Sequence, residues 1–309
     1  MKILLLGANG QIGHALRRTL AATGQLVCAT RSGHLDDGGA CVAVDLSDPR
    51  SLGRALDETA AELIVNAAAY TAVDRAEEEP QLAERINHLA VGEIGAWAAC
   101  RGATIVHYST DYVFDGRATQ PYREQDPTSP LGVYGQSKLA GEQALAASGA
   151  AHLILRTAWV YAAHGRNFLL TMLRLAGERE ELRIVADQTG APTPAGLIAR
   201  TTTAMVEQWR VLDANRQHDL SGFWHLTAAG RCTWFEFAEA IMADAHAAGL
   251  VTRTPRMVPI ASADYPTRAL RPAFSVLDCS KLQSAFGLHL DDWRHGLQRV
   301  IGEIAERRH

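Results

Sequence analysis

Two side chains that can transfer protons lie four residues apart in the segment Tyr134-Gly135-Gln136-Ser137-Lys138. On a helix this spacing places both on one face, where they can act on the same substrate atom. An unperturbed phenol titrates near pH ~10, and it exchanges its proton at neutral pH only when something stabilises the phenolate. A lysine ammonium one turn away does so through its positive charge. We interpret Tyr134 and Lys138 as a catalytic pair, with an ordinary helix start as the alternative for an isolated Y-x-x-x-K.

A hydroxyl group that could assist this pair lies upstream, in Ser109-Thr110-Asp111-Tyr112-Val113-Phe114-Asp115-Gly116. This run ends an apolar strand expected over 103–110, and the pair lies on the next helix, so both reach the same rim of a parallel sheet. Thr110 could hydrogen-bond a substrate carbonyl oxygen while Tyr134 supplies its proton, and Ser109 is the weaker candidate. Taken alone, a threonine at a strand end is more often bonded to nearby backbone.

The N-terminus carries the features of a dinucleotide-binding turn. Residues 2–6 predict a buried strand, and Gly7-Ala8-Asn9-Gly10-Gln11-Ile12-Gly13 follows it, before a helix with apolar Ile12, Leu16 and Leu20. Glycines allow the sharp turn and the close approach of the backbone to a diphosphate, whose charge suits a helix N-terminus. The G-x-x-G-x-x-G spacing is weak alone, but after an all-apolar strand it indicates a nucleotide cofactor.

The end of the second expected strand, residues 26–31, indicates which cofactor. An acidic residue at that position favours NAD, whereas a basic one suits the 2′-phosphate of NADP. This chain has Arg31 followed by Ser32, and a guanidinium makes forked contacts with phosphate. We expect NADPH, with NADH as the alternative.

Alternating elements predict an α/β fold. Further strands are expected over 41–46 and 63–69, with helices over 50–60 and 74–99, which predicts a Rossmann-type doubly wound parallel sheet over residues 1–163. Asp45 lies where it could reach an adenine edge, and the small residues 67–69 leave room for a ligand at a strand end. Beyond about residue 163 the alternation stops, and we expect a smaller mixed α/β substrate-binding region over 164–309, with some segments packing back on the first domain.

Composition excludes several classes of function. The 309 residues have a formal net charge of −4, so no basic footprint for nucleic acid is present. No apolar run approaches the ~20 residues that span a bilayer, and the first apolar run is too short for a signal peptide. The odd number of scattered cysteines and the absence of metal-ligand spacing argue against disulfides and structural zinc. We expect a cytoplasmic protein that does not bind membranes.

Several motifs together resemble one enzyme family. The glycine turn with Tyr134 and Lys138 is similar to the extended short-chain dehydrogenase/reductases that act on nucleotide sugars. More narrowly, the chain resembles the dTDP-4-dehydrorhamnose reductases in four segments: Asn66-Ala67-Ala68-Ala69-Tyr70-Thr71-Ala72-Val73-Asp74, residues 109–116, Asp187-Gln188-Thr189-Gly190-Ala191-Pro192-Thr193, and Arg271-Pro272.

The resemblance implies hydride transfer from NADPH to C4 of dTDP-4-dehydro-6-deoxy-L-mannose, which gives dTDP-L-rhamnose. Tyr134 would protonate the forming alkoxide, Lys138 would bind the nicotinamide ribose and lower the tyrosine pKa, and Thr110 would assist. Cofactor contacts are expected from Gly7, Gly10, Gln11, Ile12, Gly13, Arg31, Ser32, Asp45, Leu46, Ala67, Ala68, Ala69, Tyr134 and Lys138. Substrate contacts are expected from Thr71, Thr110, Asp111, Tyr112, Trp159 and Arg271, with Arg268 a further candidate for the diphosphate.

Two alternative functions remain open, and the sequence differs from the family pattern in its first helix. A sibling epimerase or dehydratase would keep its cofactor bound and oxidised, and a non-catalytic NADP-binding regulator on this fold would typically lack the tyrosine or the lysine. Some family members bind magnesium at a dimer contact through acidic residues, one of them early in the first helix. Here that helix reads His14-Ala15-Leu16-Arg17-Arg18. We therefore expect no metal, and a monomer or a weak homodimer.

Overall fold

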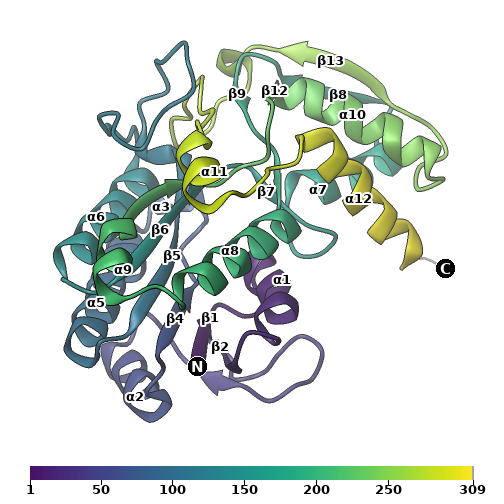
Figure 1. Cartoon of the computed structure of the whole chain (residues 1–309). Helices are drawn as coiled ribbons and strands as arrows, with labels where there is room; N and C mark the ends of the chain where they lie inside the picture. The colour runs from purple at the N-terminus through teal and green to yellow at the C-terminus, as the bar shows by residue number, and fades with distance from the viewer. Residues whose placement is uncertain (308–309) are drawn as a thin grey trace.

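A seven-stranded sheet forms the centre of the computed structural model, which describes residues 1–307 (Figure 1). The strands run in the order β11-β6-β5-β4-β1-β2-β3, and every neighbouring pair is parallel. Their bounds are β1 Lys2–Leu6, β2 Gln25–Thr30, β3 Val42–Ala43, β4 Leu63–Asn66, β5 Thr104–Thr110, β6 His152–Thr157 and β11 Gly222–His225. The predicted Rossmann-type fold class is confirmed.

Side chains alternate between the two faces of this sheet, and each face has its own core. In β1, Ile3 and Leu5 pack in one cluster, whereas Leu4 and Leu6 pack in the other. Helices α1 (Gln11–Leu20) and α8 (Ala195–Trp209) cover the first face, and α2 (Pro49–Thr59), α5 (Ala90–Arg101) and α6 (Val133–Ala147) cover the second. Because both faces are covered, strands such as β1 and β4 are runs of mainly apolar residues, as is typical of parallel strands in a two-sided sheet.

The helical stretch expected over 74–99 is present, although the structure divides it into four segments. These are α3 Val73–Ala76, α4 Pro80–Glu84, a π-helical turn Arg85–Leu89, and α5. Pro80 begins α4, where its missing N–H costs nothing. In the π-helical turn Asn87 bonds the backbone of Tyr70 and the hydroxyl of Ser137 on α6.

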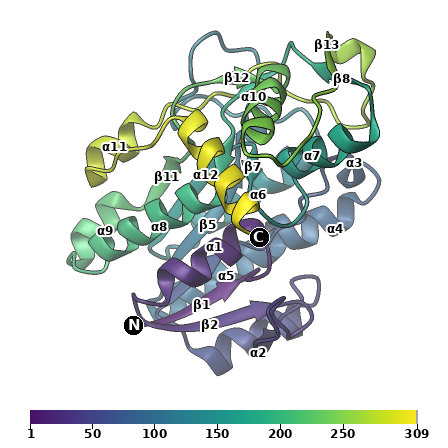
Figure 2. The same cartoon turned by 90° about the vertical axis from the view of Figure 1, so that its right-hand side faces the viewer.

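The C-terminal half builds a second layer beyond one end of the sheet (Figures 1 and 2). Helices α7 (Phe168–Glu178), α10 (Trp234–Ala247) and α12 (Trp293–Glu306) pack there around Phe237 and Trp293. Two segments return to the first half, since β11 joins the sheet and α8 packs on α1. The division at residue 163 therefore stays a prediction.

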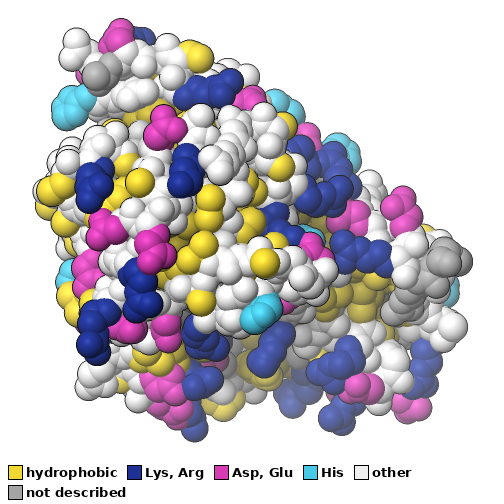
Figure 3. All heavy atoms as spheres, turned by 90° about the horizontal axis from the view of Figure 1, so that it is seen from below, with side chains coloured by type: hydrophobic (Ala, Val, Ile, Leu, Met, Phe, Trp, Pro, Cys, Tyr) yellow, Lys and Arg dark blue, Asp and Glu magenta, His cyan; other side chains and the backbone are white. Residues whose placement is uncertain are grey.

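Short elements complete the chain. They are the strands β7 Val160–Tyr161, β8 Glu181–Val185, β9 Thr189–Gly190, β10 Thr193–Pro194, β12 Cys232–Thr233 and β13 Arg256–Ile260, the helices α9 Ala214–Leu220 and α11 Ser280–Phe286, and the 3-10 turns Asp111–Val113 and Ser262–Asp264. β13 pairs with β8 in parallel. Seen from below, acidic and basic side chains are interspersed (Figure 3). None of the helices in residues 1–307 is long and apolar enough to cross a bilayer.

A buried ion pair fixes the helix that carries Tyr134. Arg156 on β6 donates to both carboxylate oxygens of Glu142 on α6, at 2.9 and 2.7 Å, and the two side chains are 3% and 0% exposed. The guanidinium also lies against the rings of Phe114 and Phe223. This one side chain therefore ties α6 to β6, β11 and the segment after β5.

Breaking this pair should destabilise the protein strongly. Glu142→Gln leaves a buried guanidinium without its counter-charge, and we expect a loss of about 3–5 kcal/mol in the free energy of unfolding, measured by urea denaturation. Arg174→Gln, which removes an exposed pair with Glu178, should cost less than about 1 kcal/mol. The double variant Glu142→Leu/Arg156→Met should be more stable than Glu142→Gln. Equal stability of Glu142→Gln and Arg174→Gln would show that the pair does not hold α6.

Candidate active site

The glycine turn after β1 is tight enough to exclude a side chain at Gly7 and at Gly13. Gly7 has φ of +80°, and a β-carbon on it would lie 2.7 Å from the nitrogen of Ala68. A β-carbon on Gly13 would lie 2.1 Å from the carbonyl oxygen of Gly7, so this residue lets α1 pack against the turn. The start of α1 has no side-chain cap and no acidic residue in its first turn. Its free N–H groups therefore suit an anionic group such as a diphosphate.

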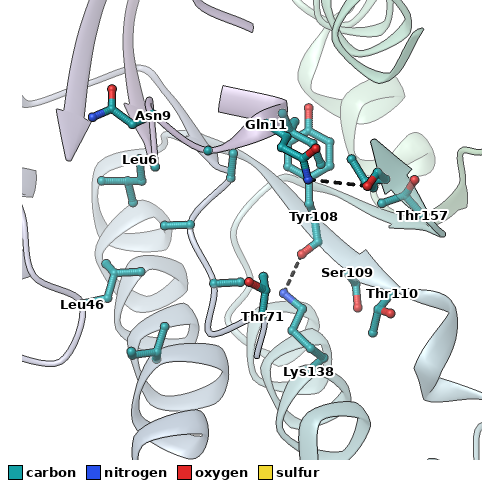
Figure 4. A pocket seen from close by; sticks show the side chains of 18 of the residues that line it. Leu6, Asn9, Gln11, Leu46, Thr71, Tyr108, Ser109, Thr110, Lys138 and Thr157 are labelled. Carbon is teal, nitrogen blue, oxygen red and sulfur yellow. Dashed lines mark hydrogen bonds between the residues drawn. The ribbon is translucent and has the colours of Figure 1, made fainter. Parts of the chain in front are cut away.

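A cleft of about 880 Å³ opens along the carboxyl ends of the strands, from the glycine turn to α6. Of the expected site residues, all but Gly13, Arg268 and Arg271 line it. The lining members are Gly7, Gly10, Gln11, Ile12, Arg31, Ser32, Asp45, Leu46, Ala67, Ala68, Ala69, Thr71, Thr110, Asp111, Tyr112, Tyr134, Lys138 and Trp159. Figure 4 shows Asn9 and Leu6 on one side of this cleft, and Thr110 with Lys138 on the other.

The end of the cleft near β2 carries polar groups suited to a ribose and its phosphate. Arg31 is exposed there, and Ser32 bonds the Thr30 hydroxyl at 3.3 Å. Asp45 accepts bonds from the backbone N–H and the hydroxyl of Ser47. These hydrogen bonds lower the pKa of Asp45, so its carboxylate stays ionised and available as an acceptor.

Tyr134 and Thr110 come together at the other end. Tyr134 has some surface on the cleft, and its surroundings raise the pKa of its hydroxyl to about 12, mainly through burial. The Thr110 hydroxyl donates to Asp111 Oδ1 at 3.1 Å and accepts from the N–H of Tyr112 at 3.1 Å. Thr110 lowers the pKa of Tyr134, because its hydroxyl can bond the phenolate, and this effect opposes that of burial. The sequence led us to expect that Lys138 lowers the pKa of Tyr134; the pKa is instead raised, mainly by burial.

Asp111 adds a second titratable group beside these hydroxyls. Its side chain is 2% exposed, and burial raises the pKa of its carboxyl to about 6. It also raises the pKa of the neighbouring Tyr134, although by less than burial does. Both effects keep the phenol protonated at neutral pH.

The amine of Lys138 contacts two residues of strand β5. Its Nζ donates to the carbonyl oxygen of Tyr108 at 2.6 Å and lies 3.2 Å from His107 Nε2 (Figure 4). Burial lowers the pKa of Lys138 to about 8. Burial also lowers the pKa of His107 well below its usual value, so this ring is neutral and carries one N–H.

The hydrogen-bond partners of His107 determine where that proton lies. Asn66 Oδ1 accepts from the N–H of Ala68 at 3.2 Å, so the amide Nδ2 faces His107 Nδ1 at 3.1 Å. The ring nitrogen Nδ1 therefore accepts, and Nε2 carries the proton toward Lys138. This arrangement requires an uncharged lysine amine, which predominates only above the Lys138 pKa of about 8.

Trp159 forms a wall of the cleft in a strained conformation. Its φ is +46°, which is uncommon for a side chain of this size. The ring stacks on Trp234 at 3.5 Å with an angle of 6° between planes, and it fills the space where a side chain at Gly190 would lie. Gly190, in the segment Asp187–Thr193, therefore has no room for a side chain.

Arg271 and Arg268 lie outside the cleft lining and have carboxylate partners. Arg271 donates to both oxygens of Asp74, at 3.2 and 2.8 Å, and Arg268 pairs with Glu78. Their expected contact with a diphosphate stays a prediction. Sequence reasoning missed other lining residues, among them Asn9 inside the glycine turn and Arg166 in the loop before α7. Asn9 could have been found from its place in the turn, whereas nothing in the sequence marks Arg166.

In the described part of the chain, no group of three or more His, Cys, Asp or Glu side chains is arranged to hold a metal ion.

Fold and site together define a Rossmann-type protein of the extended short-chain dehydrogenase/reductase class. The chain belongs to a particular family within it, described as "RmlD substrate binding domain", whose sequence profile matches residues 1–306.

Relatives of known name agree with this family. A dTDP-4-dehydrorhamnose reductase of Burkholderia thailandensis is 47% identical over 307 residues, which cover 98% of this chain and 99% of that protein. The enzyme of the same name from Escherichia coli K12 is 43% identical over 304 residues, which cover 98% of each. A solved dTDP-4-dehydrorhamnose reductase of Bacillus anthracis, in complex with NADP, has a TM-score of 0.84 at 31% identity and covers 98% of this chain and 100% of that chain.

The tautomer of His107 gives a direct test of the site. In protein labelled with ¹⁵N-histidine, NMR at about pH 9 should show His107 protonated on Nε2, because Lys138 is then an amine. Below its pKa of about 8 the lysine ammonium needs an acceptor, so the His107 proton should move to Nδ1 while the ring stays neutral. Lys138→Met should keep the Nε2–H form at both pH values. An imidazolium signal at about pH 6 would contradict this assignment.

Proposed function

We propose that this protein reduces the C4 keto group of dTDP-4-dehydro-6-deoxy-L-mannose to dTDP-L-rhamnose, with NADPH as reductant. The observation that carries the proposal is the meeting of a protonated Tyr134 and the Thr110 hydroxyl in the same cleft as the glycine turn. The names of the relatives support this activity, and the NADP complex of the Bacillus anthracis protein supports the cofactor.

The residues of the cleft fit a dinucleotide. Gly7, Gly10 and the uncapped start of α1 would hold its diphosphate, and Arg31 with Ser32 would hold the 2′-phosphate. Lys138 would contact the nicotinamide ribose. When bound, NADPH supplies the hydride that reduces the carbonyl carbon.

Reduction requires one proton on the carbonyl oxygen, and Tyr134 is placed to supply it. A phenol with a pKa of about 12 is fully protonated at neutral pH, so the donor form is always present. When that proton leaves, Thr110 can turn its own hydroxyl proton from Asp111 to the phenolate. Protonation of Asp111, whose pKa is about 6, would release Thr110 for this role.

The opposite wall of the cleft suits a sugar ring. The indole of Trp159 offers a flat apolar face, which packs on the C–H surface of sugars. Thr71, Asp111 and Tyr112 supply polar contacts. A contact of Arg271 with the substrate diphosphate would require it to leave Asp74.

We further propose that the enzyme works in the cytoplasm, as a monomer or a weak homodimer, on this small nucleotide sugar alone. The free cysteines at positions 28, 41, 100, 232 and 279 support a reducing compartment.

Removal of the phenol oxygen tests the reaction. Tyr134→Phe should bind NADPH as the parent does, but it should lose at least about a hundredfold in kcat, because the proton donor is gone. The measurement is NADPH absorbance with dTDP-4-dehydro-6-deoxy-L-mannose. Tyr70→Phe, which removes a hydroxyl outside the cleft, is the matched control and should keep its kcat. Near-normal turnover of Tyr134→Phe would refute the mechanism, and turnover of the parent without stoichiometric NADPH loss would favour an epimerase or dehydratase.

Arg31 should set the preference for the phosphorylated cofactor. Arg31→Ala should raise the KM for NADPH roughly tenfold and leave the KM for NADH unchanged, since one exposed charge-assisted contact is lost. Arg54→Ala, also an exposed arginine, is the control. A similar rise in both KM values would instead indicate a general defect of the cleft.

A further inference from the structure

A second cavity, of about 340 Å³, lies between α1, α8, α12 and the loop that carries His164. It shares no lining residue with the large cleft. Figure 2 shows the C-terminal end of α12 beside α1, with α8 next to them. The charged and titratable side chains that line this cavity are His14, Arg18, His164, Arg200, Arg299, Glu303 and Arg307.

The lining has far more positive than negative charge. Four arginines line the cavity together with one acidic residue, Glu303. Arg200 and Arg299 share a single partner outside it, Asp291, at the long distances of 4.0 and 3.4 Å. Among residues 1–307, no salt bridge involves Arg18 or Arg307. Arg299 also lowers the pKa of Arg200, although burial lowers it more, which shows that these two like charges are close.

Two histidines extend the same surface. The rings of His14 and His164 are in contact, with centroids 4.2 Å apart. His164 Nε2 is buried and has no hydrogen-bond partner among the described residues. The pKa values of both histidines are lowered, first by burial and then by neighbours that include Arg307. A buried nitrogen without a partner is costly, and a bound acceptor would satisfy it.

We propose that this cavity is a binding site for a phosphate dianion, separate from the nucleotide cleft. Guanidinium groups from α8 and α12 would make forked contacts with the phosphate oxygens, and the histidines of α1 and the 164 loop would donate from the other side. A dianion fits this lining better than a monoanion, because Arg200 and Arg299 share one carboxylate partner and Arg18 and Arg307 have no salt bridge among residues 1–307. The ligand is either inorganic phosphate or the terminal phosphoryl group of an ester.

Calorimetric titration of orthophosphate into the full-length protein, against chloride at equal ionic strength, measures this site. The parent should bind phosphate saturably, and Arg200→Gln/Arg299→Gln should bind it roughly tenfold more weakly. The control Arg174→Gln/Arg253→Gln loses the same charge at exposed positions outside both cavities and should bind as the parent does. Methyl phosphate is titrated in parallel. If methyl phosphate binds as tightly as orthophosphate, phosphate esters are identified as ligands. If methyl phosphate binds more weakly, inorganic phosphate is the ligand.

Histidine NMR locates the binding. Phosphate should shift the ring signals of His14 and His164, assigned with His14→Asn and His164→Asn, and leave His107 unmoved. Phosphate held only in the nucleotide cleft would bind equally to the parent and to Arg200→Gln/Arg299→Gln, and that result would overturn the proposal. If this double variant does not fold, Arg18→Gln/Arg307→Gln, at two exposed positions, provides the same comparison.

Discussion

The buried pair of Arg156 and Glu142 is the interaction on which the site depends. The proposed catalytic tyrosine is on a helix and the proposed assisting hydroxyl is on a strand, and a shift of one against the other would separate them. Arg156 lies on β6, next to β5 in register, and it binds α6 through both carboxylate oxygens of Glu142. A forked contact between two fully desolvated groups has little freedom to slide. The proposed proton donor is therefore held against the end of β5.

Burial has opposite effects on the two members of the Y-x-x-x-K motif. It raises the pKa of Tyr134 and lowers that of Lys138, because each group loses water around its charged form. Sequence reasoning assigned the lysine to stabilise a phenolate. Burial instead keeps Tyr134 in its protonated form and lowers the pKa of Lys138. The lysine nitrogen has His107 and the carbonyl oxygen of Tyr108 as its partners. This arrangement suits a reaction that consumes a proton with each hydride.

The predicted elements were most accurate where local pattern and tertiary packing agree. The glycine turn and β1 follow from turn chemistry and an apolar run, which act within a few residues. The helical stretch expected over 74–99 is present, but its π-helical turn at Arg85–Leu89 was not predicted, because distant groups stabilise it through bonds of Asn87 to Tyr70 and Ser137. β13 was missed because its partner β8 lies some 75 residues earlier.

The sequence by itself determined the fold class, the position of the nucleotide turn, and the pairing of Tyr134 with Lys138 on one helical face. These depend on spacing along the chain, which the covalent geometry of helices and strands converts directly into space. Only the tertiary structure decided that Arg271 is bound to Asp74, that Trp159 rests on Trp234, and that Lys138 meets His107. Each of these contacts joins residues 30 or more positions apart, and packing and desolvation at such range leave no mark in local sequence.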